Sequence, residues 1–289
     1  MDVLVTHYEQ NETVSVAIES LRRQLSAEDG IYVVDAGSED DSFSELERFD
    51  AQRDIELVYR DGVSRGRGRQ IAFEHADSDV VVAQADLDTE FHAALPDLVE
   101  YYRRLTDDRG PGILLVNGCL IGYRDVIEDA GGWRDLQVHE DKDLWMRVDE
   151  RATLYVLPVT TIKHHANFEW SSLRYRLRRR YRNYRDALRL GVPADVLAAS
   201  LRHHRPIHRR GTDALLFALA RRRAAALEQY STLDGVDFDP EASFLRELTF
   251  EALVDSGAID PVFTSPPETL RQYESESAYP GQTSYSESS

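Results

Sequence analysis

The sequence predicts an α/β protein with a doubly wound, mainly parallel sheet flanked by helices. The alternation of local patterns predicts this fold, and the residues that follow the strands predict where a ligand binds. In the first half of the 289-residue chain, short β-branched runs alternate with segments of helical periodicity, as in strands joined by helical crossovers. Several of these runs are followed at once by acidic or aromatic residues, and ligands of such sheets bind beyond the carboxyl ends of the strands.

Each element follows from a local pattern. Short apolar runs rich in Val and Ile predict strands at 3–6, 31–34, 55–58, 80–84, 112–116 and 154–162. Apolar residues spaced three to four apart predict helices at 14–25, 40–49, 67–75, 95–105 and 141–148. The helix at 40–49 begins with acidic residues, which the helix dipole favours at an N-terminus.

The composition changes at two places, which predicts three parts of the chain. Residues 1–170 hold the strand and helix repeats and form the α/β domain in this prediction. Residues 171–263 form an arginine-rich helical extension, with a helix expected at 173–190. Residues 264–289 have few aliphatic and many Ser, Glu and Pro residues, so we expect a disordered acidic tail.

The charge of the chain is strongly negative, with 34 basic against 52 acidic residues and a net charge of −18. Only Lys142 and Lys163 are lysines. Such a surface repels itself at low ionic strength and is stabilised by salt, as in proteins of halophilic archaea, with an ordinary acidic protein as the alternative. Because the chain has a single cysteine, no signal-peptide pattern and no apolar run of about 18 residues, we expect a cytoplasmic protein.

Asp86 and Asp88 follow the strand at 80–84 and lie two residues apart. In an extended chain, residues i and i+2 point the same way, so the two carboxylates can share one ligand. A divalent cation such as Mg²⁺ or Mn²⁺ binds carboxylate oxygens and bridges to phosphates. The alternative is a strand-end turn whose acidic side chains face water.

Four stretches, in this order, resemble the family 2 glycosyltransferases, which have the A-type nucleotide-sugar transferase fold. THYEQNETV resembles the family's PTYN strand end, and VVDAGSEDDS resembles its VVDDGSxD turn, with Ala36 replacing the second aspartate. RGRGRQIAFEHADSDVVVAQADLDTEF matches the RN helix and the acidic DxD motif. GGWRDLQVHEDKDLWMRV looks like the GGF…EDxDLxxR block. The resemblance covers roughly residues 1–170 and implies that they form a nucleotide-sugar-binding catalytic domain.

This resemblance implies an inverting, metal-dependent glycosyltransferase that moves a sugar from a nucleoside-diphosphate donor to a hydroxyl or lipid-linked acceptor in surface glycan or glycoprotein biosynthesis. It implies that Asp141, beside Glu140, is the general base, that Asp86 reaches the ribose and the metal, and that Asp88 ligates the metal directly. For Glu140 and Asp141 the alternative is a helix N-terminus decorated with acids.

Two other functions are open. A sugar-phosphate nucleotidyltransferase would carry a glycine-rich loop after the first strand, which THYEQNET lacks. A non-catalytic binding protein of the same fold would not need to retain both acidic pairs.

Donor binding is expected of Tyr8, Asp35 and Arg69. Tyr8 would stack on the base, and Asp35 would accept hydrogen bonds from the ribose or base. Arg69, in the RN slot, would pair with phosphate or orient Asp35. The alternatives are simple packing for Tyr8, an Asx turn before Gly37 for Asp35, and a solvated helix position for Arg69.

His164 and His165 follow the last strand. Some A-type transferases complete the metal site with a histidine at this place, which favours His164, and a structural or surface pair is the alternative. Trp133 and Trp145 are candidates for lining the acceptor site, with core packing the alternative for Trp145.

The helix at 173–190 carries arginines three to four apart along one side, namely Arg174, Arg178, Arg182, Arg185 and Arg189. Such a helix binds an anionic membrane surface or a lipid phosphate, or it packs on the acidic domain through ion pairs. The acidic total charge and the lack of a reading motif argue against nucleic acid. We therefore expect a nucleotide-sugar donor, a glycan or lipid-phosphate acceptor, and peripheral contact with the inner membrane face.

Overall fold

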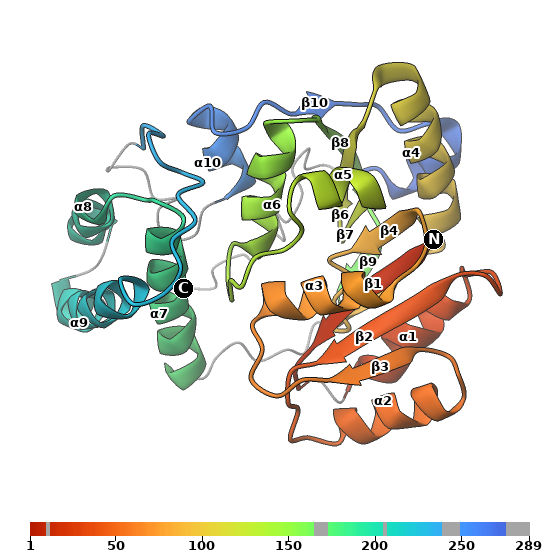
Figure 1. The fold of residues 1–289 in the computed structure, drawn as a ribbon, viewed down its shortest axis with the longest axis horizontal. Coiled ribbons are helices and arrows are strands. Elements are labelled where there is room, and N and C mark those ends of the chain that lie inside the picture. Colours follow the sequence, from red (N-terminus) through yellow and green to blue (C-terminus); the bar gives the residue numbers. More distant parts are fainter. Residues whose placement is uncertain (10–11, 165–172, 205–206, 239–248, 276–289) are drawn as a thin grey trace.

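A computed structural model describes residues 1–9, 12–164, 173–204, 207–238 and 249–275 (Figure 1). Its centre is an eight-stranded sheet. The strands, in chain order, are β1 (Asp2–His7), β2 (Gly30–Asp35), β3 (Glu56–Tyr59), β4 (Val80–Ala83), β6 (Gly112–Asn117), β7 (Cys119–Tyr123), β8 (Thr153–Thr160) and β10 (Val262–Phe263). Their order across the sheet is β10-β8-β6-β7-β4-β1-β2-β3. All neighbours are parallel except β7, which is antiparallel to both β4 and β6. The predicted mainly parallel sheet is therefore confirmed.

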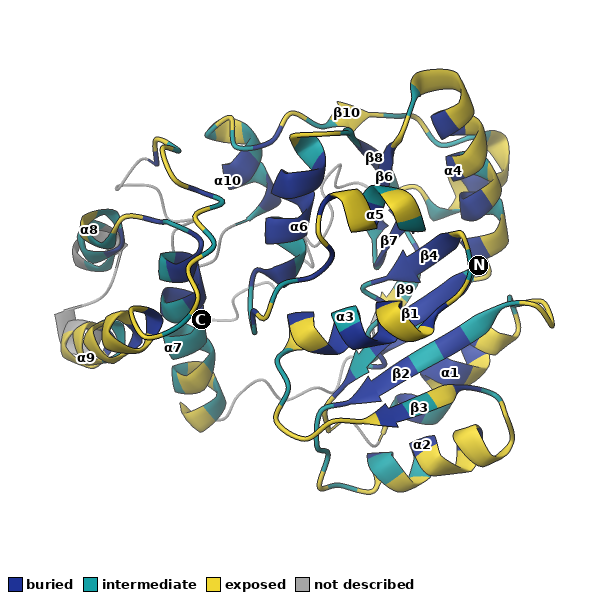
Figure 2. Cartoon of the chain, in the orientation of Figure 1, coloured by how far each residue is buried: buried dark blue, intermediate teal, exposed yellow. Residues whose placement is uncertain are grey.

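The helices of the first half are α1 (Val14–Arg22), α2 (Ser42–Ala51), α3 (Arg65–His75), α4 (Leu95–Arg109), α5 (Arg124–Asp129) and α6 (Glu140–Asp149). They cover both faces of the sheet, because successive strand residues point to opposite sides. Val3 and Val5 of β1 pack in the core formed with α1, α2 and α4, whereas Leu4 packs in the core formed with α3 and α6. Figure 2 shows the strands of the sheet as mostly buried.

The extension consists of α7 (Leu173–Arg189), α8 (Ala194–His204), α9 (Ile207–Ala224) and α10 (Phe250–Asp255). In Figure 1, α7, α8 and α9 form a group beside α6, and α7 and α9 are in extensive contact. Among the described residues, no helix combines the length and the apolar character needed to cross a bilayer.

Two predictions about the second half are corrected by the structure. The strand expected at 154–162 is two strands, β8 and β9 (Ile162–His164), and β9 pairs with β5 (Thr89–Phe91) in a separate two-stranded ribbon. The disordered tail expected from residue 264 is wrong for 264–275. This segment follows the edge strand β10, forms the 3₁₀ helix η2 (Glu268–Tyr273), and buries Leu270 in the core. Residues 276–289 lie outside the described part.

Candidate functional site

The predicted acidic pair lies in the turn that connects β4 to β5. Ala85 and Leu87 are buried in the core, while Asp86 and Asp88 alternate with them and are partly exposed. The chain turns at residues 87–88, so the extended geometry assumed for the pair ends there. Burial and the charge of Asp86 raise the pKa of Asp88 to about 6. The two carboxylates therefore lie close enough to repel each other.

The second acidic pair occupies the first turn of α6. Glu140 is buried, whereas the side chain of Asp141 is 20% exposed. Burial and the charge of Asp141 raise the pKa of Glu140 to about 7. Asp141 accepts two bonds on Oδ1, from Arg69 and from the indole Nε1 of Trp133 at 3.3 Å. Among the described residues, its Oδ2 accepts no hydrogen bond.

Arg69 on α3 joins the two acidic pairs. Its guanidinium is 2% exposed and binds Glu140 Oε1 at 2.6 Å, Asp141 Oδ1, and Asp86 Oδ1 at 3.5 Å. Burial lowers the pKa of Arg69, but the three carboxylates raise it by more, so the side chain stays charged. The solvated-helix alternative is therefore wrong, and the partners of Arg69 are these three acids rather than Asp35.

Two glycines let α3 approach closely enough to deliver Arg69. A Cβ at Gly66 would lie 2.0 Å from the carbonyl oxygen of Arg134, and one at Gly68 would lie 2.5 Å from Thr6 Cγ2. Both clashes are closer than van der Waals contact allows. The spacing RGRGR is thus a packing requirement, which the residue pattern alone did not indicate.

A second arginine, Arg65, lies at the mouth of this cluster. Its side chain is half-exposed, and its Nε is 3.9 Å from Glu140 Oε1. The charge of Asp86 is the largest contribution that raises the pKa of Arg65. This residue was missed at the sequence level, although it lies in the first turn of the same helix that carries Arg69.

The other two predicted donor residues lie at the ends of the neighbouring strands. Tyr8 follows β1 and is 49% exposed, so it is available for stacking and is not packed in the core. Asp35 ends β2 and is fully buried. Its Oδ1 accepts from the backbone N–H groups of Gly37 and Ser38, and its Oδ2 accepts from Ser38 Oγ at 2.6 Å. Asp35 therefore holds the Asx turn that was its alternative.

His164 comes near the acidic turn through the β5–β9 ribbon. Its backbone pairs with Thr89, the residue after Asp88. His165 lies outside the described residues. Trp145 is buried and contacts Phe250 edge to face at 5.7 Å between ring centroids, which confirms core packing.

Asp143 and Arg147, from the same motif as the α6 acids, have a structural role. Asp143 is fully buried and accepts from Arg147 Nη2 at 2.7 Å and from Thr232 Oγ1 at 2.6 Å. Arg147 also donates to the carbonyl oxygens of Ala130 and Gly132. These bonds tie α6 to the loop before it and to the extension.

The chemistry of the acidic turn fits a hard divalent cation. In the described part of the chain, no group of three or more His, Cys, Asp or Glu side chains is arranged to hold a metal ion. Asp86 and Asp88 provide two carboxylates, of which Asp86 also pairs with Arg69 at 3.5 Å. Mg²⁺ and Mn²⁺ suit such a pair, since oxygen is their preferred ligand and Mg²⁺ usually keeps positions for water and phosphate.

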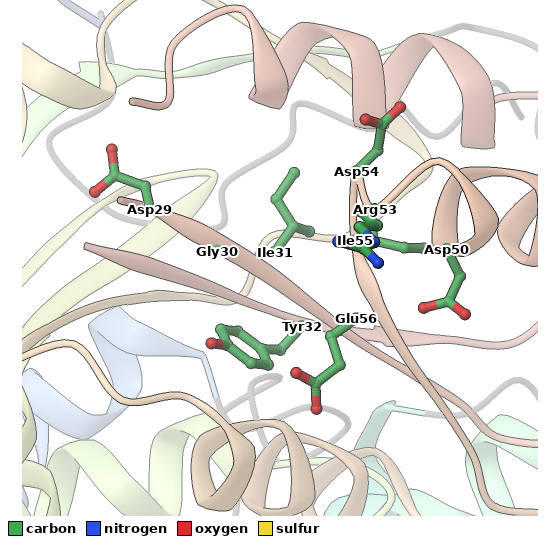
Figure 3. A pocket seen from close by; sticks show the side chains of 9 residues that line it. All are labelled: Asp29, Gly30, Ile31, Tyr32, Asp50, Arg53, Asp54, Ile55 and Glu56. Atoms are coloured by element: carbon green, nitrogen blue, oxygen red, sulfur yellow. The ribbon is translucent and has the colours of Figure 1, made fainter. Parts of the chain in front are cut away.

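A separate hollow of about 320 Å³ lies at the amino ends of β2 and β3, away from these acids (Figure 3). Its acidic side chains already have partners. Asp29 pairs with the N-terminal ammonium at 2.5 Å, Asp54 pairs with Arg22 at 2.7 Å, and Asp50 accepts from Leu57 N. We assign no function to this hollow.

Comparisons with known proteins identify a family and similar folds. A family model described as Glycosyl transferase family 2 matches residues 2–134. The structure of S. aureus TarS is similar with a TM-score of 0.50 at 13% identity, over 89% of this chain and 54% of that chain. The mannosyltransferase PcManGT from Pyrobaculum calidifontis, in complex with GDP-Man and Mn²⁺, has a TM-score of 0.46 at 15% identity, over 89% and 83%. A search of curated proteins found no match. The match to glycosyl transferase family 2 covers residues 2–134, which include the Asp86 and Asp88 pair.

Proposed function

We propose that this protein is an inverting, metal-dependent glycosyltransferase that uses a nucleoside-diphosphate sugar and an acceptor with a hydroxyl or lipid-phosphate group. One observation carries the proposal. Arg69 binds both the predicted base helix and the predicted metal turn, so residues 55 apart in the sequence, Asp86 and Asp141, meet at one guanidinium. An acceptor hydroxyl and a donor diphosphate both need groups of these kinds within one cleft.

Asp141 is the better base of the α6 pair. It is the more exposed of the two carboxylates, and both hydrogen bonds that it accepts from the described residues are on Oδ1, so Oδ2 can accept a proton from the acceptor hydroxyl. Glu140 is buried against Arg69 and supports the charge balance. A positioned base contributes about 10²- to 10⁴-fold to the rate. One direct displacement assisted by such a base inverts the anomeric centre.

The acidic turn has the other role. Asp86 and Asp88 would hold the divalent cation, which when bound supplies Lewis-acid stabilisation of the leaving diphosphate. Arg65, whose side chain is half-exposed beside Glu140, would neutralise phosphate charge. Tyr8, half-exposed at the end of β1, would stack on the nucleobase of the donor. His164, whose backbone pairs with Thr89, would be a further ligand of the cation.

The test is hydrolysis and transfer from a panel of UDP- and GDP-sugars with Mn²⁺ in molar KCl. Asp88→Ala and Asp141→Asn should each lose activity, the first together with Mn²⁺-dependent nucleotide binding and the second without it. Asp149→Asn, at the far end of α6, is the control and should retain activity. Equal activity in all four proteins would reject the site assignment.

A further inference from the structure

The backbone that leads into α6 has an unusual conformation just before the proposed base. His139, the residue before Glu140, has φ 69°, in the left-handed region that non-glycine residues rarely adopt. The same residue is buried, and its carbonyl oxygen accepts from Asp143 N at 2.9 Å. Such a conformation persists only where surrounding contacts hold it.

Asp186 of α7 supplies the contact on the amino side of His139. Its carboxylate is fully buried, and Oδ2 accepts from the backbone N–H groups of Gln137 at 2.9 Å and Val138 at 3.1 Å. Arg185 donates to both oxygens of the same carboxylate, at 2.6 and 2.9 Å. The carboxylate therefore pairs with Arg185 and also accepts hydrogen bonds from the two main-chain N–H groups that precede His139.

Arg189, one turn further along α7, holds the same loop through a carbonyl. Its Nη1 donates to the carbonyl oxygen of Asp135 at 2.6 Å, and its Nη2 donates to Tyr230 Oη at 3.0 Å. Arg189 is itself buried. The second half of α7 is thus docked on the loop before α6 through hydrogen bonds to the main chain. This contact differs from the ion pairs with the acidic domain that the intramolecular alternative expected, because Arg185 and Arg189 pair with Asp186 of α7 itself.

We propose that Asp186 is a positioning residue for the transfer reaction, an inference that rests on the proposed role of Asp141 as the base. Asp186 does not reach the acidic cleft itself. It fixes the main chain at 137–138, which fixes the turn at His139, and this turn sets the direction of the first turn of α6. The extension therefore contributes to catalysis, because it sets the orientation of Asp141.

Asp186→Asn is the first test, in the full chain. The carboxamide has one oxygen and one NH₂ group, so it cannot accept from the loop and from Arg185 as the carboxylate does. Small misplacements of a reacting group can cost about 10²-fold in rate. We therefore expect kcat to fall about tenfold to a hundredfold, while the Mn²⁺-dependent affinity for UDP or GDP stays within about twofold.

The matched control is Asp213→Asn. Asp213, on α9, is also a fully buried carboxylate of the extension and pairs with another α7 arginine, Arg180, at 3.2 Å. This variant should lose thermal stability but retain kcat. A folded Asp186→Asn variant with wild-type kcat, or a similar fall of kcat in both variants, would overturn the proposal.

A readout without turnover separates this inference from the proposed function. The Trp133 indole N–H, which bonds to Asp141, has its own cross-peak in a ¹H–¹⁵N NMR spectrum, separate from the backbone amides and assignable with Trp133→Phe. We expect this resonance to shift in Asp186→Asn and not in Asp213→Asn, even if no donor in the panel is transferred. If Asp186→Asn does not fold, Asp186→Glu keeps the charge but moves the oxygens, and the same shift is expected. An unmoved resonance in a folded Asp186 variant contradicts the positioning role.

Discussion

Arg69→Gln is expected to destabilise the protein, and more strongly at high pH than at low pH. The lost guanidinium pairs at 2.6 Å with the buried Glu140 and also with Asp141. Breaking a buried ion pair costs about 3–5 kcal/mol because the remaining charge is left uncompensated. Glu140 can avoid this cost by binding a proton, since burial and Asp141 already raise its pKa to about 7. Without Arg69 this pKa rises further.

The sign of the pH dependence follows from proton linkage. The native variant keeps a proton on Glu140 that the unfolded chain releases above about pH 4.5, so the free energy of unfolding increases as the pH falls. Relative to wild type, we expect a loss of about 3 kcal/mol or more at about pH 8 and a clearly smaller loss at about pH 5.

Urea denaturation in molar KCl at the two pH values measures this loss. Arg67→Gln is the matched control, two residues earlier on α3. Arg67 pairs with Glu74 at 3.3 Å, with side chains that are 48% and 49% exposed. An exposed pair of this kind contributes about 1 kcal/mol or less. Equal losses for the two variants, or a loss in Arg69→Gln that does not change with pH, would refute the reasoning.

Three further predictions concern the same cleft and helix α3. Arg65→Gln should weaken Mn²⁺-dependent pyrophosphate binding about tenfold by calorimetry, as expected for one lost charge-assisted bond, whereas Arg67→Gln should not; equal affinities would remove Arg65 from the site. Gly66→Ala should lower the melting temperature, because overpacking costs about 1–3 kcal/mol. Gly211→Ala on α9 is the control, since its Cβ meets no atom within 4 Å and should stabilise the protein by up to about 1 kcal/mol. Similar melting-temperature shifts in the two variants would contradict the close approach of α3 to the carbonyl oxygen of Arg134. Because the pKa of Glu140 is raised, its stabilising contribution is complete below about pH 4.5 and is lost as the pH rises through about 7. Glu140→Gln should therefore flatten the fall of the unfolding free energy that the wild type shows over that range. An unchanged slope would contradict the raised pKa of Glu140.

The succession of strands and helices along the first half of the chain could be predicted, because each element leaves a local pattern. Buried strands are β-branched runs, and the crossover helices are amphipathic. The antiparallel strand β7 could not, because only Gly118, with φ 113°, separates it from β6, so no helical pattern marks the connection. The strand β10 has only two residues, which is too few to show an alternating pattern, and its position depends on pairing with the edge of β8.

The residue types of the site could be predicted, but their partners could not. Glu140 follows Arg69 by 71 residues, and nothing local in either helix indicates that one guanidinium binds both acidic pairs. The choice between a donor-binding and a turn-forming Asp35 also depended on atoms two and three residues away, whose hydrogen bonds appear only once the backbone is placed. Asp186 lies still further along the chain, in a segment whose composition suggested a different partner.

The strand β10 has a consequence for how the protein is made. Because Val262 and Phe263 pair with Tyr155 and Val156, one edge of the central sheet is completed by residues that are translated after the other seven strands of that sheet. Until then, β8 is a nascent edge with unpaired backbone groups, which invites pairing with other chains. A chain terminated before residue 262 would keep both acidic pairs of the site but leave this edge of β8 unpaired. We expect such a chain to lose activity through aggregation, although its site residues are intact.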